Sequence, residues 1–220
     1  MLILSAYHRV LTYWKKIIYE LLFIEQWQLR YKFDQNTETG FDGQLNTYQQ
    51  IIPPKDRFWA DPFIVEENGV HYVFVEELEF EEGKGYISVI ELKEGVSKPL
   101  KSQKILEKPY HLSYPFIFKL QDTYYMIPES TANKTIDLYQ CEDFPLKWRY
   151  CNALMENVIA ADTTIKFHDG KYWLFTLIEP EQGITTNKDL HIFYSDDLLS
   201  NNWVAHPANP VVSDVSSARP

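Results

Sequence analysis

One short phrase recurs three times in this chain at intervals of roughly 50 residues, the period expected for the blades of a β-propeller. The three copies are Trp59–Ile64, Ser113–Ile117 and Ala161–Ile165. Each copy leads through a short turn into a second aromatic-rich run, and these runs are His71–Phe74, Tyr124–Ile127 and Tyr172–Phe175. The recurrence predicts tandem hairpins and therefore indicates which side chains of successive modules face one another.

The composition fits a β-rich globular chain. Of 220 residues 45% are hydrophobic, which is sufficient for a core, and 15 Tyr, 13 Phe and 6 Trp favour strands. The net charge of −10 argues against a general nucleic-acid binder, because such proteins use Lys and Arg to contact phosphates. Cys141 and Cys151 have neither metal-site spacing nor a disulfide framework, and no cofactor motif occurs, so we expect no metal and no cofactor.

Residues 1–24 differ in character from the rest of the chain. Val10, Trp14, Ile17 and Leu21 follow a helical stripe, which predicts an amphipathic N-terminal helix as a separate segment. Two interpretations stay open, namely a helix packed on the propeller or on a preceding domain, and a helix on a membrane surface. The apolar start is too short for a signal peptide or a transmembrane span, so we expect a cytoplasmic protein.

Residues 25–220 are expected to form one β-propeller domain. Three four-stranded blades are predicted over residues 56–108, 109–157 and 158–213. Their outer strands are expected at 86–92, 101–106, 135–140, 148–154, 190–195 and 203–206. Residues 25–33 alternate like a strand, and the polar stretch 34–50 is expected to be a loop.

The last three residues, Ala218–Pro220, align with Ala60–Pro62, which indicates the start of a further blade. Three blades would leave pairing edges exposed instead of closing a ring. We therefore expect an incomplete propeller belonging to a longer protein, in which strand 25–33 completes the last blade of the ring.

Acidic residues occupy related places in the three hairpins. Residues equidistant from a hairpin turn lie opposite one another, so Asp61 is expected opposite Glu76 and Tyr114 opposite Glu129. Asp162 occupies the corresponding place in the third hairpin. Because the first strands of all blades begin at the same end of the channel, these side chains are expected at one rim, with Glu77 behind them.

Carboxylates that converge in a cavity suit glycosidic bond cleavage, which needs one protonated and one ionised group. Close spacing itself raises one pKa. Three interpretations of Asp61 and Asp162 stay open: they brace the channel through hydrogen bonds to backbone, they catalyse, or they bind a ligand without turnover.

Other groups near the rim could hold a sugar. Trp59 could stack on a pyranose face, and Arg57, His111, Tyr114 and Arg219 could donate hydrogen bonds. The alternatives are that Trp59 belongs to the core, that His111 is structural, and that the two arginines neutralise the acidic rim.

The chain resembles a known family through several motifs in order. These motifs are Phe58–Pro62, His111–Phe116, Ile127–Ser130, Ala161–Thr164, His206–Val211 and Ala218–Pro220. They resemble the N-terminal propeller domain of the glucosamine inositolphosphorylceramide transferase family, which is in turn similar to the five-bladed propellers of glycoside hydrolase family 43. The resemblance implies an all-β, five-bladed propeller of which this chain holds about three blades.

The resemblance also implies roles for individual residues. In the similar hydrolases an Asp that opens the first blade is base or nucleophile, and this role maps onto Asp61. A second Asp usually opens the next blade, where this chain has Tyr114. Glu129 is then the candidate acid and Asp162 the candidate supporting carboxylate.

Two functions from different classes stay open at this point. The first is a carbohydrate-acting domain that binds a glycan or glycoconjugate at the acidic rim, with hydrolysis or transfer of a glycosyl unit. The second is a non-catalytic accessory propeller that docks a fused or neighbouring glycosyltransferase or formyltransferase module. A fold alone does not separate them.

Overall fold

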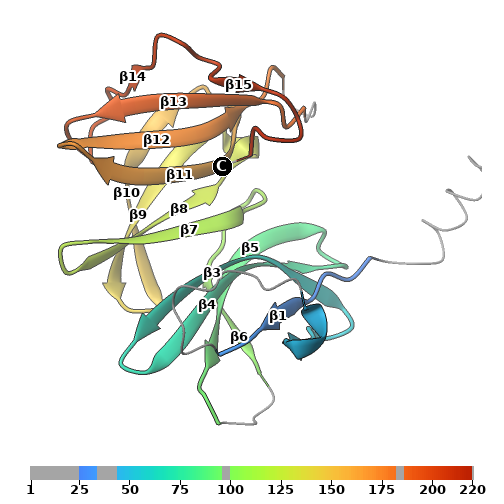
Figure 1. The fold of residues 1–220 in the computed structure, drawn as a ribbon. Helices are drawn as coiled ribbons and strands as arrows, with labels where there is room; N and C mark the ends of the chain where they lie inside the picture. The colour runs from blue at the N-terminus through green and yellow to red at the C-terminus, as the bar shows by residue number, and fades with distance from the viewer. Residues whose placement is uncertain (1–24, 34–43, 96–99, 182–185, 220) are drawn as a thin grey trace, which may run out of the picture.

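The computed structural model describes residues 25–33, 44–95, 100–181 and 186–219, and the described part of the chain is all-β apart from two short 3₁₀ helices (Figure 1). Three antiparallel sheets follow one another in chain order, each built from successive strands. The repeats thus correspond to three sheets, of which the first two have the four predicted strands and the third has a fifth strand. The predicted N-terminal helix, residues 1–24, lies outside the described residues.

The first blade consists of β3 (Arg57–Glu67), β4 (Val70–Glu79), β5 (Lys84–Leu92) and β6 (Ser102–Leu106). The second consists of β7 (Ser113–Leu120), β8 (Thr123–Glu129), β9 (Thr135–Asp143) and β10 (Lys147–Glu156). The third consists of β11 (Ala160–His168), β12 (Lys171–Ile178), β13 (Asp189–Ser195) and β14 (Val204–Ala205), and β15 (Val212–Ser213) also pairs with β13. The 3₁₀ helices are η1 (Leu45–Thr47) and η2 (Thr131–Asn133).

A separate two-stranded sheet packs on the first blade. It joins β1 (Leu29–Tyr31) to β2 (Gln49–Ile51), and the side chains of Leu29 and Ile51 are buried against Trp59 and its neighbours. The strand predicted over 25–33 is thus shorter than expected. The predicted loop over 34–50 misses β2, because that strand buries one apolar side chain and has no alternating pattern.

Two-residue turns set the register of the first hairpin in every blade. Their first residues, Asn68, Gln121 and Asp169, have φ of +53°, +54° and +49°. Gly69 and Gly170 follow with φ of +73° and +75°, as turns that match the twist of a hairpin require. Local sequence therefore determines where each blade folds back on itself.

Apolar side chains between the sheets hold the blades together. Phe74 of the first blade is buried in one cluster with Met126 and Tyr139 of the second. Ile127 of the second blade is buried in another cluster with Leu174 of the third. Among the described strands the sheets do not close into a ring, so the prediction of five blades stays a prediction.

Two kinds of feature are absent from the described residues. None of their helices is sufficiently long and apolar to cross a membrane. Within the same residues, no group of three or more His, Cys, Asp or Glu side chains is arranged to hold a metal ion.

Candidate functional site

The first strand of each blade contains one residue in the left-handed backbone region. Asp61, Tyr114 and Asp162 have φ of +47°, +41° and +53°. Each lies in a β-bulge, where the pairing of the first strand with the second shifts by one residue. Non-glycine residues rarely adopt this conformation, and backbone strain of this kind concentrates at functional sites. A left-handed residue in a β-bulge therefore recurs at the equivalent position of the first strand in all three blades.

The bulges correct the predicted pairing. Ala60, not Asp61, is the partner of Glu76, and Ser113, not Tyr114, is the partner of Glu129. Counting from the turn assumes regular pairing, and an extra residue in the first strand displaces every partner beyond it by one. The acidic side chains still gather, because the displacement is the same in each blade.

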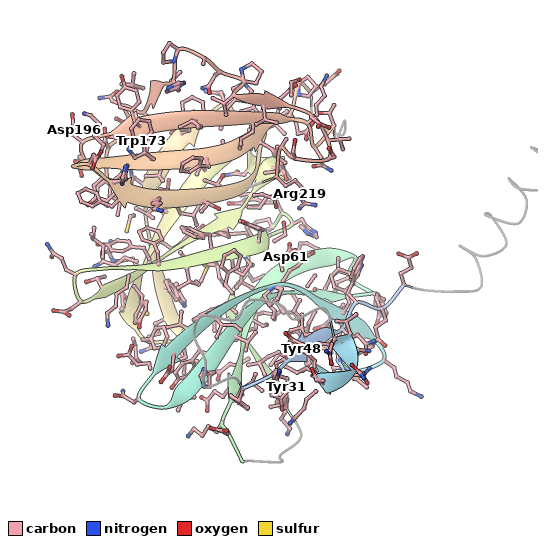
Figure 2. The ribbon with its side chains drawn as sticks, in the orientation of Figure 1. Tyr31, Tyr48, Asp61, Trp173, Asp196 and Arg219 are labelled. Carbon is pink, nitrogen blue, oxygen red and sulfur yellow. The ribbon has the colours of Figure 1, made fainter. Side chains whose placement is uncertain are left out.

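The bulges of the second and third blades are each hydrogen-bonded to a carboxylate of the preceding blade. The backbone N–H of Tyr114 donates to Oδ2 of Asp61 at 3.3 Å. The backbone N–H of Asp162 donates to Oε2 of Glu129 at 3.1 Å. Asp162 in turn accepts from Nε of Arg219 at 2.6 Å, and Figure 2 shows Asp61 and Arg219 on the same side of the molecule. We call Asp61, Tyr114, Glu129, Asp162 and Arg219 the rim.

Glu76 and His111 extend the rim between the first and second blades. His111 Nε2 lies 2.9 Å from Oε1 of Glu76, and His111 Nδ1 accepts the backbone N–H of Gly85 at 3.0 Å. The ring therefore carries its proton on Nε2 and donates it to Glu76. Glu76 raises the pKa of His111, whereas the Gly85 N–H favours the neutral ring because an imidazolium would present a second N–H to it.

Two rim carboxyl groups titrate near neutral pH. Burial, with the nearby charge of Glu76, raises the pKa of Asp61 to about 6. Burial raises the pKa of Glu129 to about 7, although the Asp162 N–H bond lowers it and the Asp162 charge adds to the rise. Removal from water disfavours the charged form of a carboxyl group, and neighbouring carboxylates add to this effect. The rim can therefore hold protons at pH values where exposed carboxyl groups have none.

The side chain of Tyr114 links the second blade to the first and third. Its ring packs edge-on against Phe63 with centroids 4.9 Å apart, and its hydroxyl lies 3.3 Å from Oγ1 of Thr164. Burial raises the pKa of Tyr114, so this hydroxyl stays neutral. Tyr114 thus presents a neutral hydroxyl where the resemblance implied a carboxylate.

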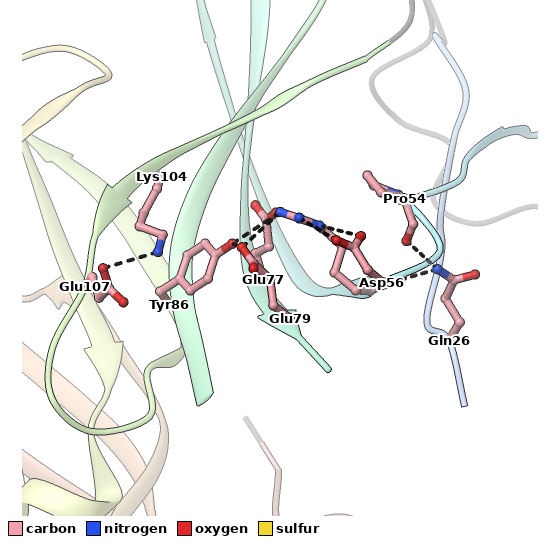
Figure 3. Close-up of polar contacts among 9 residues, drawn as sticks. Gln26, Pro54, Asp56, Glu77, Glu79, Tyr86, Lys104 and Glu107 are labelled. Carbon is pink, nitrogen blue, oxygen red and sulfur yellow. Dashed lines mark hydrogen bonds and ion pairs between the residues drawn. The ribbon is translucent and has the colours of Figure 1, made fainter. Parts of the chain in front are cut away.

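Arg57 and Trp59, which were both predicted to contact a sugar, have other partners in the structure. Arg57 is bound to Asp56, Glu77 and Glu79 in the polar network of Figure 3, with N–O distances of 2.9, 2.7 and 3.1 Å. Glu77, expected behind the rim, is held in this network. Trp59 is 1% exposed and lies in the core, so its ring offers no face to a sugar.

Sequence reasoning missed the contribution of Gly85. The N–H of Gly85 donates to Nδ1 of His111, and its C=O accepts the backbone N–H of Leu112. A Cβ on Gly85 would lie 2.6 Å from the Leu112 carbonyl oxygen and 2.8 Å from Cε1 of His111. No motif signals this contact, because it joins two blades across 26 residues.

Comparisons with known proteins agree with the motif resemblance. A family model described as "Glucosamine inositolphosphorylceramide transferase 1, N-terminal" matches residues 48–219. Glucosamine inositolphosphorylceramide transferase 1 of Oryza sativa subsp. japonica is 33% identical over 155 residues, which are 70% of this chain and 20% of the rice protein. The chain thus spans about a fifth of the length of that relative.

Solved structures support the fold. A family 117 glycoside hydrolase from the marine bacterium Zobellia galactanivorans has a TM-score of 0.56 at 15% identity, over 85% of this chain and 62% of that one. A thermostable family-43 glycoside hydrolase has a TM-score of 0.50 at 14% identity, over 70% of this chain and 56% of that one. At such identities the likeness concerns the fold, which is that of a glycoside-hydrolase-like propeller.

Proposed function

This chain belongs to the N-terminal family of glucosamine inositolphosphorylceramide transferase 1, and from that premise we propose that it recognises the carbohydrate part of a glycoconjugate without cleaving it. The rim would accept hydrogen bonds from sugar hydroxyl groups through Asp61 and Glu129. The domain would then serve as an accessory to a transferase module, fused or neighbouring, that carries out the reaction.

The use of the carboxylates as connectors between blades carries this proposal. Asp61 and Glu129 each accept a backbone N–H of the next blade, and Glu129 also accepts from the hydroxyl of Thr131 at 3.3 Å. The Asp162 side chain is 4% exposed and ion-paired with Arg219. A carboxylate that attacks a sugar or activates water needs a free oxygen facing the substrate. Both oxygens of Glu129, Oδ2 of Asp61 and Oδ2 of Asp162 instead accept hydrogen bonds within the protein, which leaves further lone pairs for a sugar hydroxyl.

A partly exposed, hydrogen-bonding rim still suits binding. His111 remains 41% exposed at its side chain, and Tyr114 presents a hydroxyl. Rigid carboxylate and hydroxyl groups held by neighbouring blades lose little freedom when they bind a sugar, which favours recognition. The name of the rice relative contains glucosamine and inositolphosphorylceramide. We therefore propose that the ligand of this chain also carries a sugar.

Hydrolysis is the second candidate, and one observation favours it. The raised pKa of Glu129, about 7, leaves part of this group protonated at neutral pH, as a general acid requires. In that case Asp61 would have to act as the partner base or nucleophile.

An assay of the intact chain separates the two candidates. A panel of aryl glycosides and a glycan array are tested with the natural chain, with Asp61→Asn, and with Asp196→Asn as a control at an 81% exposed side chain. We expect no turnover in any form and glycan binding that only Asp61→Asn weakens. Turnover that Asp61→Asn abolishes would establish hydrolysis. Absence of both turnover and binding would leave the non-catalytic docking function.

A further inference from the structure

His111 forms a contact between the first and second blades that depends on its ring being neutral. The residue lies in the segment that leads into β7, and its Nδ1 accepts the backbone N–H of Gly85 in β5 at 3.0 Å. The next residue, Leu112, donates its backbone N–H to the carbonyl oxygen of Gly85 at 2.9 Å. Gly85 is therefore joined to this segment by two hydrogen bonds, and the bond to the ring involves a group that can gain a proton.

Protonation of the ring is incompatible with its contact to Gly85. A proton on Nδ1 would leave two N–H groups pointing at each other, with their nitrogen atoms 3.0 Å apart. The backbone cannot easily move apart at this point, because the side chain of Leu112 is 0% exposed and lies in the core. The side chain of His111 is 41% exposed, so the ring can turn outward instead.

Three carboxyl groups on neighbouring strands favour the protonated ring. Glu76 in β4 lies 2.9 Å from Nε2 and raises the pKa of His111 most strongly, whereas burial lowers this pKa. The charges of Glu129 in β8 and Asp61 in β3 raise it further. An imidazolium at this place would thus be stabilised by carboxylates from three strands.

In β5 the backbone N–H of Gly85 opposes protonation of the ring. The charged side chain next to Gly85 in this strand is Lys84, which is paired with Glu107 at 3.3 Å. The carboxylates therefore favour the imidazolium, and the N–H of Gly85 favours the neutral ring. Because these influences oppose each other, we expect the ring to titrate between about pH 5 and 8, where histidine acts as a switch.

We propose that His111 is a pH-sensitive latch between the first two blades, closed while its ring is neutral and released when the ring is protonated. In the closed state the ring connects Gly85 to Glu76. After release, the bond between Leu112 and Gly85 remains, so the contact loosens at the ring without coming apart. Strand β7 begins two residues after His111 and carries Tyr114 of the rim, so the release is transmitted to the rim.

NMR of the labelled natural chain between about pH 5 and 8 tests the latch. The ring nitrogens of His111 and the backbone amide of Gly85 are followed together, and we expect both to change with one midpoint above the ordinary histidine value. Glu76→Gln keeps an acceptor for Nε2 but removes the charge, so it should lower this midpoint by about 1 pH unit. A ring that does not titrate in this range, or a Gly85 amide that does not follow the ring, would overturn the proposal.

The variant His111→Asn separates the latch from the other titrating groups of the rim. Its amide oxygen replaces Nδ1 as the acceptor for the Gly85 N–H and does not titrate. The Gly85 amide signal should then be constant with pH, while the Tyr114 amide should still move at the pKa of Asp61, about 6. Equal movement of the Gly85 amide in the natural chain and in His111→Asn would assign it to a carboxyl group and contradict the latch.

The consequence for carbohydrate binding rests on the proposed function. If only the closed state binds a sugar, the dissociation constant one pH unit below the midpoint rises by about tenfold, because about one ring in ten is still neutral. The ratio of affinities above and below the midpoint should therefore be larger in the natural chain than in His111→Asn by up to about tenfold. Equal ratios would show that the latch does not control the rim. Absence of binding at every pH would contradict the proposed function, while the ring and Gly85 signals would still decide the latch.

Discussion

Arg219 Nε lies 2.6 Å from Oδ2 of Asp162, so the last described residue of the chain is tied to the left-handed residue of the third blade. The Asp162 side chain is 4% exposed, whereas that of Arg219 is 58% exposed. Loss of one partner therefore has unequal consequences, because an uncompensated charge is costly only where it is buried.

The first prediction concerns this ion pair. Arg219→Met keeps an apolar stem but leaves the carboxylate of Asp162 buried without its cation. We expect the free energy of unfolding in urea to fall by about 1 kcal/mol, since exposure of Arg219 reduces the effect below that of a fully buried pair. Lys171→Met is the matched control, because its partner Asp196 is 81% exposed. Equal losses in the two variants would show that Asp162 does not depend on Arg219.

The second prediction concerns Gly85. Gly85→Ala places a Cβ 2.6 Å from the Leu112 carbonyl oxygen and 2.8 Å from Cε1 of His111, so the connection between the first two blades must move. We expect a loss of about 2 kcal/mol in the free energy of unfolding. Gly95→Ala is not a suitable control because Gly95 has a φ of +73°, and Ser88→Ala in the same strand serves instead. NMR of the imidazole nitrogens provides the second readout.

In the natural chain the imidazole spectrum should report a proton on Nε2 of His111, and Gly85→Ala should change it. An unchanged spectrum together with unchanged stability would refute the close contact of Gly85 with His111.

The third prediction is a dependence of stability on pH. The pKa values of Asp61 and Glu129 are raised by folding to about 6 and about 7, so the folded chain binds more protons than the unfolded chain in this range. Their contribution to stability is complete below the ordinary carboxyl pKa and is lost as the pH rises towards about 7. We expect Glu129→Gln to flatten the decline in the unfolding free energy between roughly pH 4.5 and 7.5. If the unfolding free energy of the variant declines with the same slope, other groups cause the decline.

The fourth prediction concerns the hairpin turns. Gln121 is exposed and has a φ of +54°, which costs a side chain with a Cβ more than it costs glycine. Gln121→Gly should therefore raise the free energy of unfolding by about 0.5 kcal/mol, while Gly170→Ala at φ +75° should lower it by about 1 kcal/mol. Thermal unfolding of both variants checks the opposite signs. Two changes of the same sign would contradict the left-handed assignment of one turn.

The blades could be predicted from the sequence because their signals are local and repeated. A turn such as Asn68–Gly69 between two aromatic runs is visible within a few residues, and its recurrence defines the period. Family membership was likewise contained in short motifs. In contrast, β2 has too little alternation to be recognised, since Gln49 and Gln50 are both exposed.

The candidate site was predicted in its members but not in its geometry. The repeat alone was sufficient to predict that Asp61, Glu129 and Asp162 lie near one another. The bulged residues form hydrogen bonds to neighbouring blades, and counting along the sequence reveals neither the bulges nor these bonds. For the same reason the Gly85–His111 contact and the burial of Trp59 could not be predicted.

The most direct test of the carbohydrate-recognising rim uses the two amides that it holds. The backbone N–H groups of Tyr114 and Asp162 donate to Asp61 and Glu129, so their NMR signals report any change at these carboxylates. The labelled chain is titrated with glucosamine, N-acetylglucosamine and β-1,3-galactotriose up to ~50 mM, which detects millimolar dissociation constants. We predict that at least one sugar shifts both signals in the natural chain and neither in Asp61→Asn. Signals that stay in place with all three sugars, or that move equally in Asp61→Asn, would contradict a carbohydrate site at the rim.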